Sequence, residues 1–474
     1  MNRWLSQFFC FALLFVAGAT LWSHAAGRPR GSTQASSNSS APGAIHHIFL
    51  VSVDGLKPQS YTEPDAHGLK VPLMREIVRN GAWSDGVQPV MPTVTYPSHT
   101  AMATGANPGT SGISTNVAFD PLDKNSEGWQ WYTEDIRVPT IWQVAREHGL
   151  RTALIHWPVT VGAQADLNVP EYWRASIPED LKLLRALSTP LNILPDVAKE
   201  FPEVATDLTP PNGTDAAFTD IACYAIEKWQ PNLLMLHIAA VDHWEHEKGP
   251  FSPEAIDVTE KADAQIARLI EAAKKAGIWD DSVLVIVSDH GFAPIAKDFR
   301  PGVLLAEHGL VKLNAKNHPE EWKAAVLNES GSAFLYVKDE KDEATRRALL
   351  DIFKPLAGKP GSSIRRVITH DEIVAFGGDP DAFLAIEAAD GTRFVTGYTG
   401  KLAGPSEKKG THGYFPDRPE MRASMLVYGP AIGAGKIQNA RLIDVGPTVA
   451  RWLGLELTKA EGKPLEIPMR TASH

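Results

Sequence analysis

Three short segments carry carboxylate and imidazole side chains of the kind that bind divalent metals. Asp242 and His246 are four residues apart, so both lie on one face if their segment is helical. Asp289 and His290 are adjacent after an apolar run, so on a tight turn they reach one ion from two directions. His412 lies in a loop with glycines close on either side. This mixture of ligands suits zinc or another borderline divalent metal.

A hydroxyl that could serve as a nucleophile is found at Thr95. Pro97 fits the first turn of a helix, which places Thr95 at the N-terminus of that helix. Free backbone N–H groups and the positive end of the helix dipole favour a phosphoryl oxygen there. An alcohol needs an adjacent base or a metal to ionise it at neutral pH. The alternative for Thr95, taken alone, is that it only caps the helix.

Each candidate ligand also has an ordinary explanation. An aspartate after a strand, such as Asp54, is commonly a turn former or helix cap, and a lone histidine in a loop is commonly a surface residue. The Asp-His-Gly sequence at 289–291 is moderately specific, whereas the pair at 242 and 246 is weak by itself. The metal hypothesis therefore depends on the set rather than on any member.

The elements that must position these residues are those of an α/β protein. Short β-branched runs alternate with helical patterns, which predicts a mostly parallel sheet with helices on both faces. Strands are expected at 48–53, 154–156, 233–238 and 282–288, and helices at 71–79 and from Ser252-Pro253 to Gly277. Residues 300–400 read as short strands and turns, which favours a small inserted or peripheral lobe.

The order of these elements predicts one site. In open α/β sheets, ligands bind beyond the carboxyl ends of the strands. Asp54, Thr95, Asp242 and Asp289 each follow a strand or strand-like stretch. We therefore expect distant segments to meet at one edge of the sheet.

Composition is that of a globular enzyme and argues against a nucleic-acid polymer as partner. The 474 residues are 43% hydrophobic and 22% charged, with a formal net charge of −10. Binding to nucleic-acid polymers usually shows as a basic stripe or tail, and none is evident here. A small-molecule substrate is expected instead.

The N-terminus reads as a secretory signal peptide. Arg3 precedes an apolar run of roughly a dozen residues that ends in small residues. We expect a signal peptide over 1–26, a flexible polar linker over 27–44 and a catalytic domain over 45–470. The alternative is an uncleaved anchor, although a spanning helix needs about 20 apolar residues.

The small number of cysteines bears on the cellular compartment in which the protein is expected to act. Of the two cysteines, Cys10 would leave with the signal peptide, so the mature chain forms no internal disulfide. This favours a secreted or periplasmic protein of a bacterial envelope, with no stable membrane span once the signal is cleaved. Cys223 lies in a helical pattern and is predicted to be a small buried hydrophobe rather than a catalytic thiol.

The chain resembles the nucleotide pyrophosphatase/phosphodiesterase family of the alkaline phosphatase superfamily. The resemblance covers roughly residues 46–458 and implies an alkaline-phosphatase-like core. Its motifs occur in order as VSVDG (51–55), PTVTYPSH (92–99), SGISTN (111–116), DHWEHEKGP (242–250), VSDHG (287–291) and THGY (411–414).

The resemblance implies a role for each matching residue. One zinc ion would be held by Asp54, Asp289 and His290 and would also contact Thr95, the nucleophile. A second zinc ion, which activates the hydrolytic water, would be held by Asp242, His246 and His412. Asn116 would donate a hydrogen bond to a phosphoryl oxygen. His243 is the competing ligand candidate, but the family spacing favours His246, which is four residues after Asp242.

Aromatic residues provide the expected substrate contacts. The resemblance implies that Tyr96 stacks on one face of a nucleotide base and that Trp173, or Tyr172 beside it, covers the other. Trp157 belongs to a Trp-Pro element typical of the diesterases. Ordinary packing is the alternative for these rings. His237 stands where the family has a tyrosine, which leaves the base preference open.

These observations favour a two-zinc hydrolase that cleaves phosphodiester or pyrophosphate bonds, as in nucleotides, through a covalent phospho-threonine. The segment around 154–161 lacks the Lys and Arg pair with which monoesterases bind the extra phosphate charge. A phosphomonoesterase and a lipid-headgroup phosphodiesterase of the same superfamily remain alternatives. From a different class, a non-catalytic zinc-bearing envelope protein is also considered.

Overall fold

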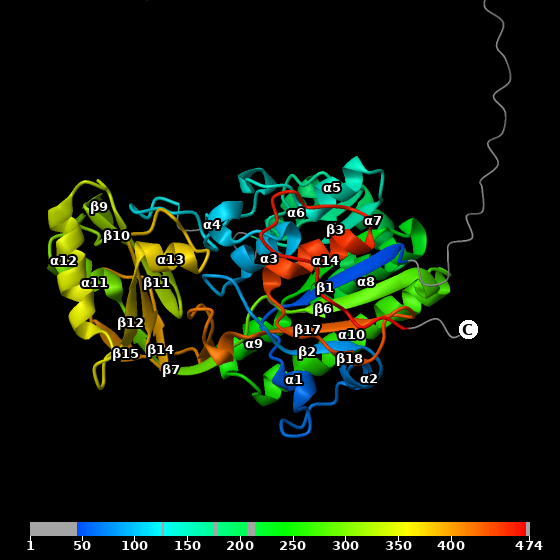
Figure 1. Cartoon of the computed structure of the whole chain (residues 1–474). Helices are drawn as coiled ribbons and strands as arrows, with labels where there is room; N and C mark the ends of the chain where they lie inside the picture. The colour runs from blue at the N-terminus through cyan, green and yellow to red at the C-terminus, as the bar shows by residue number, and fades with distance from the viewer. Residues whose placement is uncertain (1–44, 126–127, 174–177, 206–207, 209–213, 471–474) are drawn as a thin grey trace, which may run out of the picture. The chain divides into compact units, whose positions relative to one another are not determined.

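The computed structural model describes residues 45–470 except 126–127, 174–177, 206–207 and 209–213 (Figure 1). The predicted signal peptide and linker, with Cys10, lie outside the described residues. Among the helices that are described, none is both long and apolar enough to cross a membrane.

An eight-stranded sheet forms the centre of the main part of the molecule (Figure 1). Its strands in spatial order are β18 (Gly435–Lys436), β2 (Ala82–Val87), β17 (Ala423–Tyr428), β6 (Ser282–Val287), β1 (His47–Val53), β5 (Leu233–Ile238), β3 (Thr152–Ile155) and β4 (Leu167–Val169). Only β17 runs antiparallel to its neighbours, and the other neighbouring pairs are parallel. The predicted mostly parallel α/β fold is confirmed.

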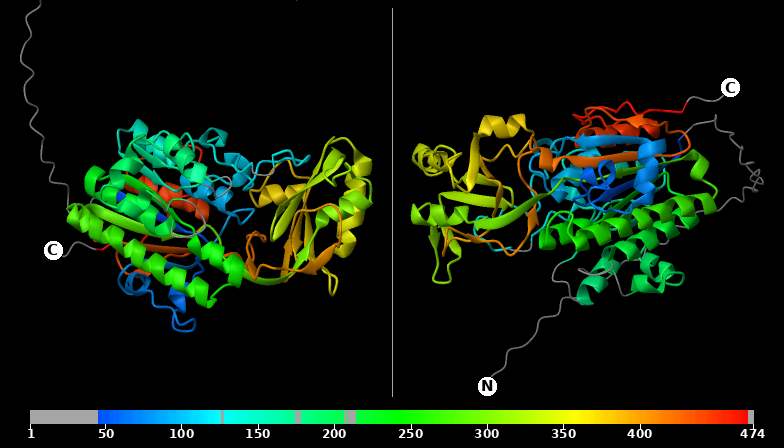
Figure 2. Two further views of the ribbon diagram at one scale, coloured as in Figure 1. Left: turned by 180° about the vertical axis from the view of Figure 1, so that it is seen from behind. Right: turned by 90° about the horizontal axis from the view of Figure 1, so that it is seen from below.

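Helices cover both faces of this sheet (Figure 2), because the central strands bury alternate side chains in two separate cores. Phe49 and Val51 of β1 enter the core beneath α2 (Pro72–Asn80), α8 (Thr214–Trp229) and α10 (Pro253–Lys275). Ile48 and Leu50 enter the opposite core, beneath α3 (Thr95–Thr104), α5 (Ile141–Glu147) and α14 (Val445–Trp452). The two-sided burial explains why these strands read as continuous apolar runs.

Local signals set the ends of the longest helix as predicted. The side chain of Ser252 accepts a hydrogen bond from the N–H of Ala255, and Pro253 takes the first helical position. The helix ends before Gly277, whose φ of +72° suits a residue without Cβ. Cys223 is buried in α8, and burial raises the pKa of its thiol to about 12, which agrees with its predicted role as a small hydrophobe.

A lobe made largely of antiparallel sheet lies beside the main sheet (Figure 1). It has its own core, which includes Leu335, Phe353 and Ile386. Its strands are β7 (Ala293–Phe299), β8 (Val311–Leu313), β9 (Pro319–Trp322), β10 (Ala324–Glu329), β11 (Ser332–Val337), β12 (Ile364–Thr369), β13 (Leu384–Ala388), β14 (Gly391–Phe394), β15 (Ala403–Pro405) and β16 (Gly410–Thr411). Its helices are α11 (Pro301–Glu307), α12 (Glu343–Phe353) and α13 (His370–Ala375).

Shorter helices complete the main part of the molecule. They are α1 (Gln59–Thr62), α4 (Pro108–Ser111), α6 (Pro178–Leu187), α7 (Ile193–Val197) and α9 (Ala240–Lys248). Of these, α9 follows β5 directly and carries two of the predicted metal ligands, so its placement matters for the site.

Candidate active site

A cavity of about 1100 Å³ lies at the carboxyl ends of β1, β5 and β6, and several of the predicted site residues line it. Asp54, Thr95, Asp242 and His246 all contribute to its wall. Three chain segments that are far apart in sequence therefore meet at one edge of the sheet, as the strand order requires.

The first ligand cluster lies at the ends of two neighbouring strands. Asp54 follows β1, and Asp289 and His290 follow β6, with Ser52 paired to Val287 in the parallel register. One ligand atom from each of the three lies within 4.8 Å of the others. All three residues of the cluster are buried.

Hydrogen bonds leave the metal-binding atoms of this cluster free. Asp289 Oδ1 accepts hydrogen bonds of 3.1 Å from the N–H groups of Gly55 and His290, so its Oδ2 remains available. His290 Nδ1 is 3.2 Å from the carbonyl oxygen of Gly291, so Nδ1 carries the hydrogen. His290 Nε2 lies 3.3 Å from Asp54 Oδ1 and 3.2 Å from Asp289 Oδ2, with none of the three atoms hydrogen-bonded.

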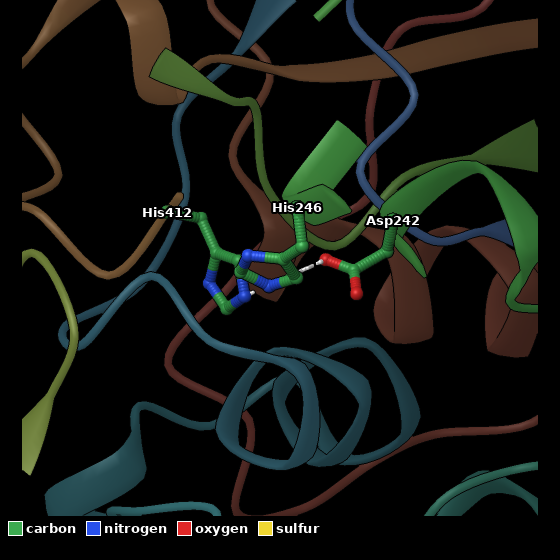
Figure 3. A group of neighbouring side chains, drawn as sticks. All are labelled: Asp242, His246 and His412. Atoms are coloured by element: carbon green, nitrogen blue, oxygen red, sulfur yellow. Dashed lines mark ion pairs between the residues drawn. The ribbon is translucent and has the colours of Figure 1, made fainter. Parts of the chain in front are cut away.

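The second cluster joins a helix to a segment returning from the lobe. Asp215 fixes the start of α9, because its carboxylate accepts 3.0 Å hydrogen bonds from the N–H groups of Ala239 and Ala240. Asp242 and His246 then project from this helix toward His412, which comes from the segment after β16 (Figure 3). The four-residue spacing thus places both side chains on one face, as predicted.

Backbone carbonyl groups orient both imidazoles of the second cluster. His246 Nδ1 lies 3.0 Å from the oxygen of Gly410, and His412 Nδ1 lies 3.0 Å from that of Thr93. Each ring therefore holds its hydrogen on Nδ1 and presents a lone pair on Nε2. Both Nε2 atoms lie 3.5 Å from Asp242 Oδ1 (Figure 3).

Electrostatics favour a cation in both clusters. No Lys or Arg nitrogen of the described residues lies within 4.0 Å of the carboxylates of Asp54, Asp242 or Asp289. Burial raises the pKa of Asp242 to about 7 and holds the pKa of Asp54 well above its usual range. Burial also lowers the pKa of His246 to about 4 and of His412 to about 3. Neutral imidazoles beside uncompensated carboxylates form a donor set that fits zinc.

The two clusters touch each other. The rings of His290 and His412 stack with centroids 3.7 Å apart and planes 10° apart. Each cluster supplies one of these rings, so ions held at the two sites would be near neighbours.

Thr95 begins α3, and its neighbours are fixed by hydrogen bonds. Val94 before it is extended, and the carbonyl of Thr95 accepts a 2.8 Å hydrogen bond from His99 Nδ1. Asn116 Oδ1 accepts a 2.9 Å hydrogen bond from the N–H of Tyr96. Because the oxygen of this amide is engaged, its Nδ2 is left as a donor beside the first turn of the helix.

The predicted aromatic contacts occupy different environments. Tyr96 and Trp173 both contribute to the cavity wall, although the Tyr96 ring is otherwise fully buried. Tyr172 packs on Trp131 at a centroid distance of 4.9 Å. Trp157 is fully buried in the core, 4.8 Å from the ring of His99. The structure thus places Trp157 behind His99 rather than at the cavity wall.

Several cavity residues were not singled out from the sequence. Trp129 lies between Tyr96 and Trp173, with ring centroids 5.3 Å and 4.8 Å from theirs. Glu171 is a buried carboxyl group of the wall, and burial raises its pKa to about 8. No pattern in the sequence separates these two from other loop residues, because only the tertiary fold brings them to the site.

Two cations reach the cavity from the lobe side, and each is paired. Arg393 Nε bonds to Asp298 Oδ1 at 2.9 Å, and Lys408 Nζ pairs with Glu247. Arg151 is exposed before β3, at the opposite end of the strands from the site.

Comparison with known proteins identifies the family. A family model described as type I phosphodiesterase / nucleotide pyrophosphatase matches residues 48–415. Human ectonucleotide pyrophosphatase/phosphodiesterase family member 1 is 23% identical over 258 residues, which are 51% of this chain and 23% of that protein. Human bis(5'-adenosyl)-triphosphatase ENPP4 is 23% identical over 427 residues, covering 86% of this chain and 78% of the relative. The chain thus spans about a quarter of the length of the first of these relatives.

Solved structures share the fold. Human ectonucleotide pyrophosphatase/phosphodiesterase 5 matches with a TM-score of 0.60 and 19% identity, over 88% of this chain and 97% of that one. An inactive variant of the murine protein in complex with AMP matches with a TM-score of 0.59 and 20% identity, over the same shares of the two chains. At these identities the likeness shows a common fold.

Proposed function

This chain belongs to the type I phosphodiesterase / nucleotide pyrophosphatase family, and we propose that it is a two-zinc hydrolase of phosphodiester or pyrophosphate bonds in nucleotides. The observation that carries the proposal is the pairing of two three-ligand clusters in contact with each other at the cavity that holds Thr95. Ions held by both clusters would activate an oxygen nucleophile and neutralise charge on the phosphoryl group.

Thr95 is proposed to form a covalent intermediate. Its Oγ forms a bond to phosphorus while the bond from phosphorus to the leaving oxygen breaks in line. Water then attacks phospho-Thr95 from the side that the leaving group vacated, which releases the phosphate product and restores the hydroxyl group. The start of α3 supports this role, because the positive end of the helix dipole favours the phosphoryl oxygens.

Asn116 is proposed to bind a non-bridging oxygen of the phosphoryl group. Its Oδ1 is held by the N–H of Tyr96, so the amide keeps one orientation and offers Nδ2 as a donor. A preorganised donor of this kind stabilises the charge that develops in the transition state.

Nucleotides are the proposed substrates, because aromatic rings flank the reacting hydroxyl. Tyr96, Trp129 and Trp173 all contribute to the cavity wall beside Thr95, and rings in such a position can stack on a base. Relatives named pyrophosphatase/phosphodiesterase and bis(5'-adenosyl)-triphosphatase support a nucleotide as the substrate class.

A diester is favoured over a monoester by the charges around the site. Arg393 and Lys408 already pair with carboxylates, so neither is a free cation for the second charge of a monoester. One observation favours the alternative of a lipid-headgroup diester: Glu171 lies in the cavity wall with Trp129 and Trp173. An amino alcohol would bring a positive charge to this buried carboxyl group and favour its ionised form, and the aromatic rings suit a cation as well.

The decisive experiment compares diester and monoester turnover on one purified, zinc-loaded sample. A p-nitrophenyl ester of a nucleoside monophosphate, p-nitrophenyl phosphocholine and p-nitrophenyl phosphate would be measured together. We expect the nucleotide diester to react fastest. Faster turnover of p-nitrophenyl phosphate would refute the diesterase assignment, and faster turnover of the choline ester would favour the headgroup alternative.

Thr95→Ala tests the nucleophile on the same sample. Turnover should fall by about 10⁴-fold or more, the scale on which removal of a nucleophile acts. Zinc content should stay at two ions per chain, because none of the six proposed ligands changes. Unchanged turnover would show that another group attacks phosphorus, whereas wild-type protein that binds zinc without any turnover would support the non-catalytic alternative.

We further propose that the protein acts outside the cytoplasm, in the periplasm or after secretion. The signal-peptide pattern at 1–26 and relatives named as ectoenzymes support this location. Fractionation of cells that express the full chain, with mass spectrometry of the N-terminus, would test both the compartment and the cleavage.

A further inference from the structure

Two buried histidines link the helix that carries Thr95 to the metal-ligand candidate Asp54. His99 Nδ1 bonds to the carbonyl oxygen of Thr95 at 2.8 Å. His99 Nε2 lies 3.1 Å from His237 Nδ1, and His237 Nε2 lies 3.4 Å from Asp54 Oδ2. Both histidines are at most 1% exposed. Three side chains and one carbonyl group thus form a continuous chain of polar contacts through the protein interior.

The rings in this chain are fixed by the fold. His99 lies on α3 and packs edge-on against Trp157 at a centroid distance of 4.8 Å. His237 is on β5, directly beside Ser52 of β1, and therefore next to the strand end that carries Asp54. The two rings meet at 4.4 Å between centroids and 82° between planes. Neither ring can turn without disturbing the packed core.

The two carboxylate oxygens of Asp54 have different neighbours at the end of this series of contacts. Its Oδ1 lies 3.3 Å from His290 Nε2, inside the first ligand cluster, whereas its Oδ2 lies toward His237. His237 Nε2 is buried and makes no hydrogen bond within the described part of the chain. A ligating carboxylate is commonly oriented by a hydrogen bond to its second oxygen, and loss of such a partner weakens metal binding.

The positions of the hydrogens along these contacts determine which partner His237 Nε2 can bond to. The carbonyl of Thr95 can only accept, so His99 Nδ1 carries a hydrogen and His99 Nε2 accepts from His237 Nδ1. The remaining atoms, His237 Nε2 and Asp54 Oδ2, face each other, and a bond between them needs one hydrogen beyond those assigned above, which the His237 and Asp54 pair would hold in common. Each ring nitrogen of His237 therefore has a separate partner.

We propose that His237 is a positioning residue for the metal site formed by Asp54, Asp289 and His290. Through Asp54 Oδ2 it fixes the direction of Asp54 Oδ1, and through His99 it ties that direction to the start of α3. The ion site and the nucleophile are thereby held as one unit. This inference rests on the proposed metal-dependent function.

Two substitutions separate the two bonds of His237. In His237→Gln the terminal amide reaches about as far as Nε2 and can still bond to Asp54. In His237→Asn the amide reaches about as far as Nδ1 and can bond only to His99. His47→Asn is the matched control, because it removes a partly buried histidine from the far end of the neighbouring strand β1.

The measurement is zinc affinity by chelator competition on the full-length protein, with the absorption spectrum of the cobalt-substituted form as a second readout. His237→Asn should weaken the tighter-bound ion by roughly 10- to 100-fold and change the cobalt spectrum. His237→Gln should stay within about threefold of wild type and keep the spectrum, because the partner of Asp54 is retained. His47→Asn should match wild type in both readouts.

Equal affinities in wild type and both His237 variants would overturn the proposal, and so would an equal loss in both variants. Asparagine is one methylene shorter than glutamine, so melting temperatures of both variants are measured to identify any general loss of stability. Failure of the proposed function is distinguishable: wild-type protein would then bind no zinc or show no turnover. If zinc binds at two sites in wild type but the variants do not differ, only the role of His237 is wrong.

Discussion

The two candidate metal sites touch, yet they are built in opposite ways. Asp54, Asp289 and His290 come from the ends of two adjacent strands, and their side chains are 0–6% exposed. Asp242 and His246 lie on one short helix, and His412 follows the lobe, with side-chain exposures of 8–21%. The first site lies at the ends of central strands of the sheet, whereas the second depends on a short helix and on a segment that follows the lobe.

This difference predicts unequal affinities for the two ions that are proposed to bind here. Strand ends inside a packed core hold ligands rigidly, so the first ion should be tight and slow to exchange. A helix held by one carboxylate, together with a segment that passes through a separate lobe, can adjust more easily. The second ion should therefore be the weaker one, and its affinity should depend on how the lobe packs.

Removal of one ligand from each cluster gives the largest expected effect. Asp289→Asn should abolish tight binding of the first ion, with a loss greater than the roughly 100-fold upper range for an outer partner. Asp242→Asn should remove the weaker ion and spare the tighter one. Zinc titration of both variants would check this. Loss of both ions in Asp242→Asn would show that the two sites are not independent.

A matched glycine pair should produce a smaller and site-specific effect. Gly413 has a φ of +85°, and a Cβ there would lie 1.8 Å from the carbonyl oxygen of Glu329. Gly291→Ala would likewise place a Cβ 2.1 Å from the oxygen of Glu420, beside His290. Gly413→Ala should weaken only the second ion, and Gly291→Ala only the first, each by at least about tenfold.

Chelator titration of the two glycine variants distinguishes these effects, and melting temperatures identify general destabilisation. If both substitutions weakened the same ion, the contrast between a core site and a lobe-dependent site would be wrong.

The metal-free protein should lose stability as pH rises from 6.5 to 9. The raised pKa values of Asp242 (about 7), Glu171 (about 8) and Glu329 (about 8) mean that the fold retains protons that the unfolded chain has released. Their stabilising effect is complete at low pH and lost as pH passes each folded-state pKa, by at most about 1.4 kcal/mol per pH unit and group. The lowered pKa values of His246 and His412 act in the opposite sense, but only below about 6.5.

Thermal melting at several pH values, with and without zinc, measures this trend. Metal-free Asp242→Asn should show a shallower fall than metal-free wild type. A melting temperature that rises with pH in the absence of metal would contradict the expectation.

The smallest effect is expected at Cys223, far from either site. Cys223→Ala removes a buried sulfur from α8 and should cost about 1 kcal/mol of unfolding free energy. Chemical denaturation measures this loss of stability. Turnover, and zinc content by metal analysis, should match wild type. A loss of zinc in this variant would show that the thiol contributes to a site after all.

Sequence patterns predicted the sheet because it depends on local periodicity, whereas the two ligand sets were implied by the resemblance to the family. The strand 233–238 and the start of the long helix at Ser252-Pro253 agree with β5 and α10, since local burial and capping determine them. The four-residue spacing of Asp242 and His246 placed both on one face of α9. These features need no knowledge of distant contacts.

The surroundings of the site could not be predicted in the same way. Trp157 reads as a substrate contact by resemblance, but packing places it behind His99 in the core. His237 read as a departure from a family pattern, and its link to Asp54 appears only when β5 and β1 pair. Glu171 reaches the cavity through a loop without a sequence signature. Such contacts join segments far apart in the chain, so periodicity carries no information about them.

The position of His412 sets an order of events during synthesis. The ligands of the first cluster have all left the ribosome once residue 290 has emerged, whereas the second cluster needs more than a hundred further residues. Because chains emerge N-terminus first, the first cluster could take up its proposed metal ion before the lobe has been synthesised. The second site would be occupied only after the lobe has been synthesised and folded, because His412 follows the lobe in the sequence.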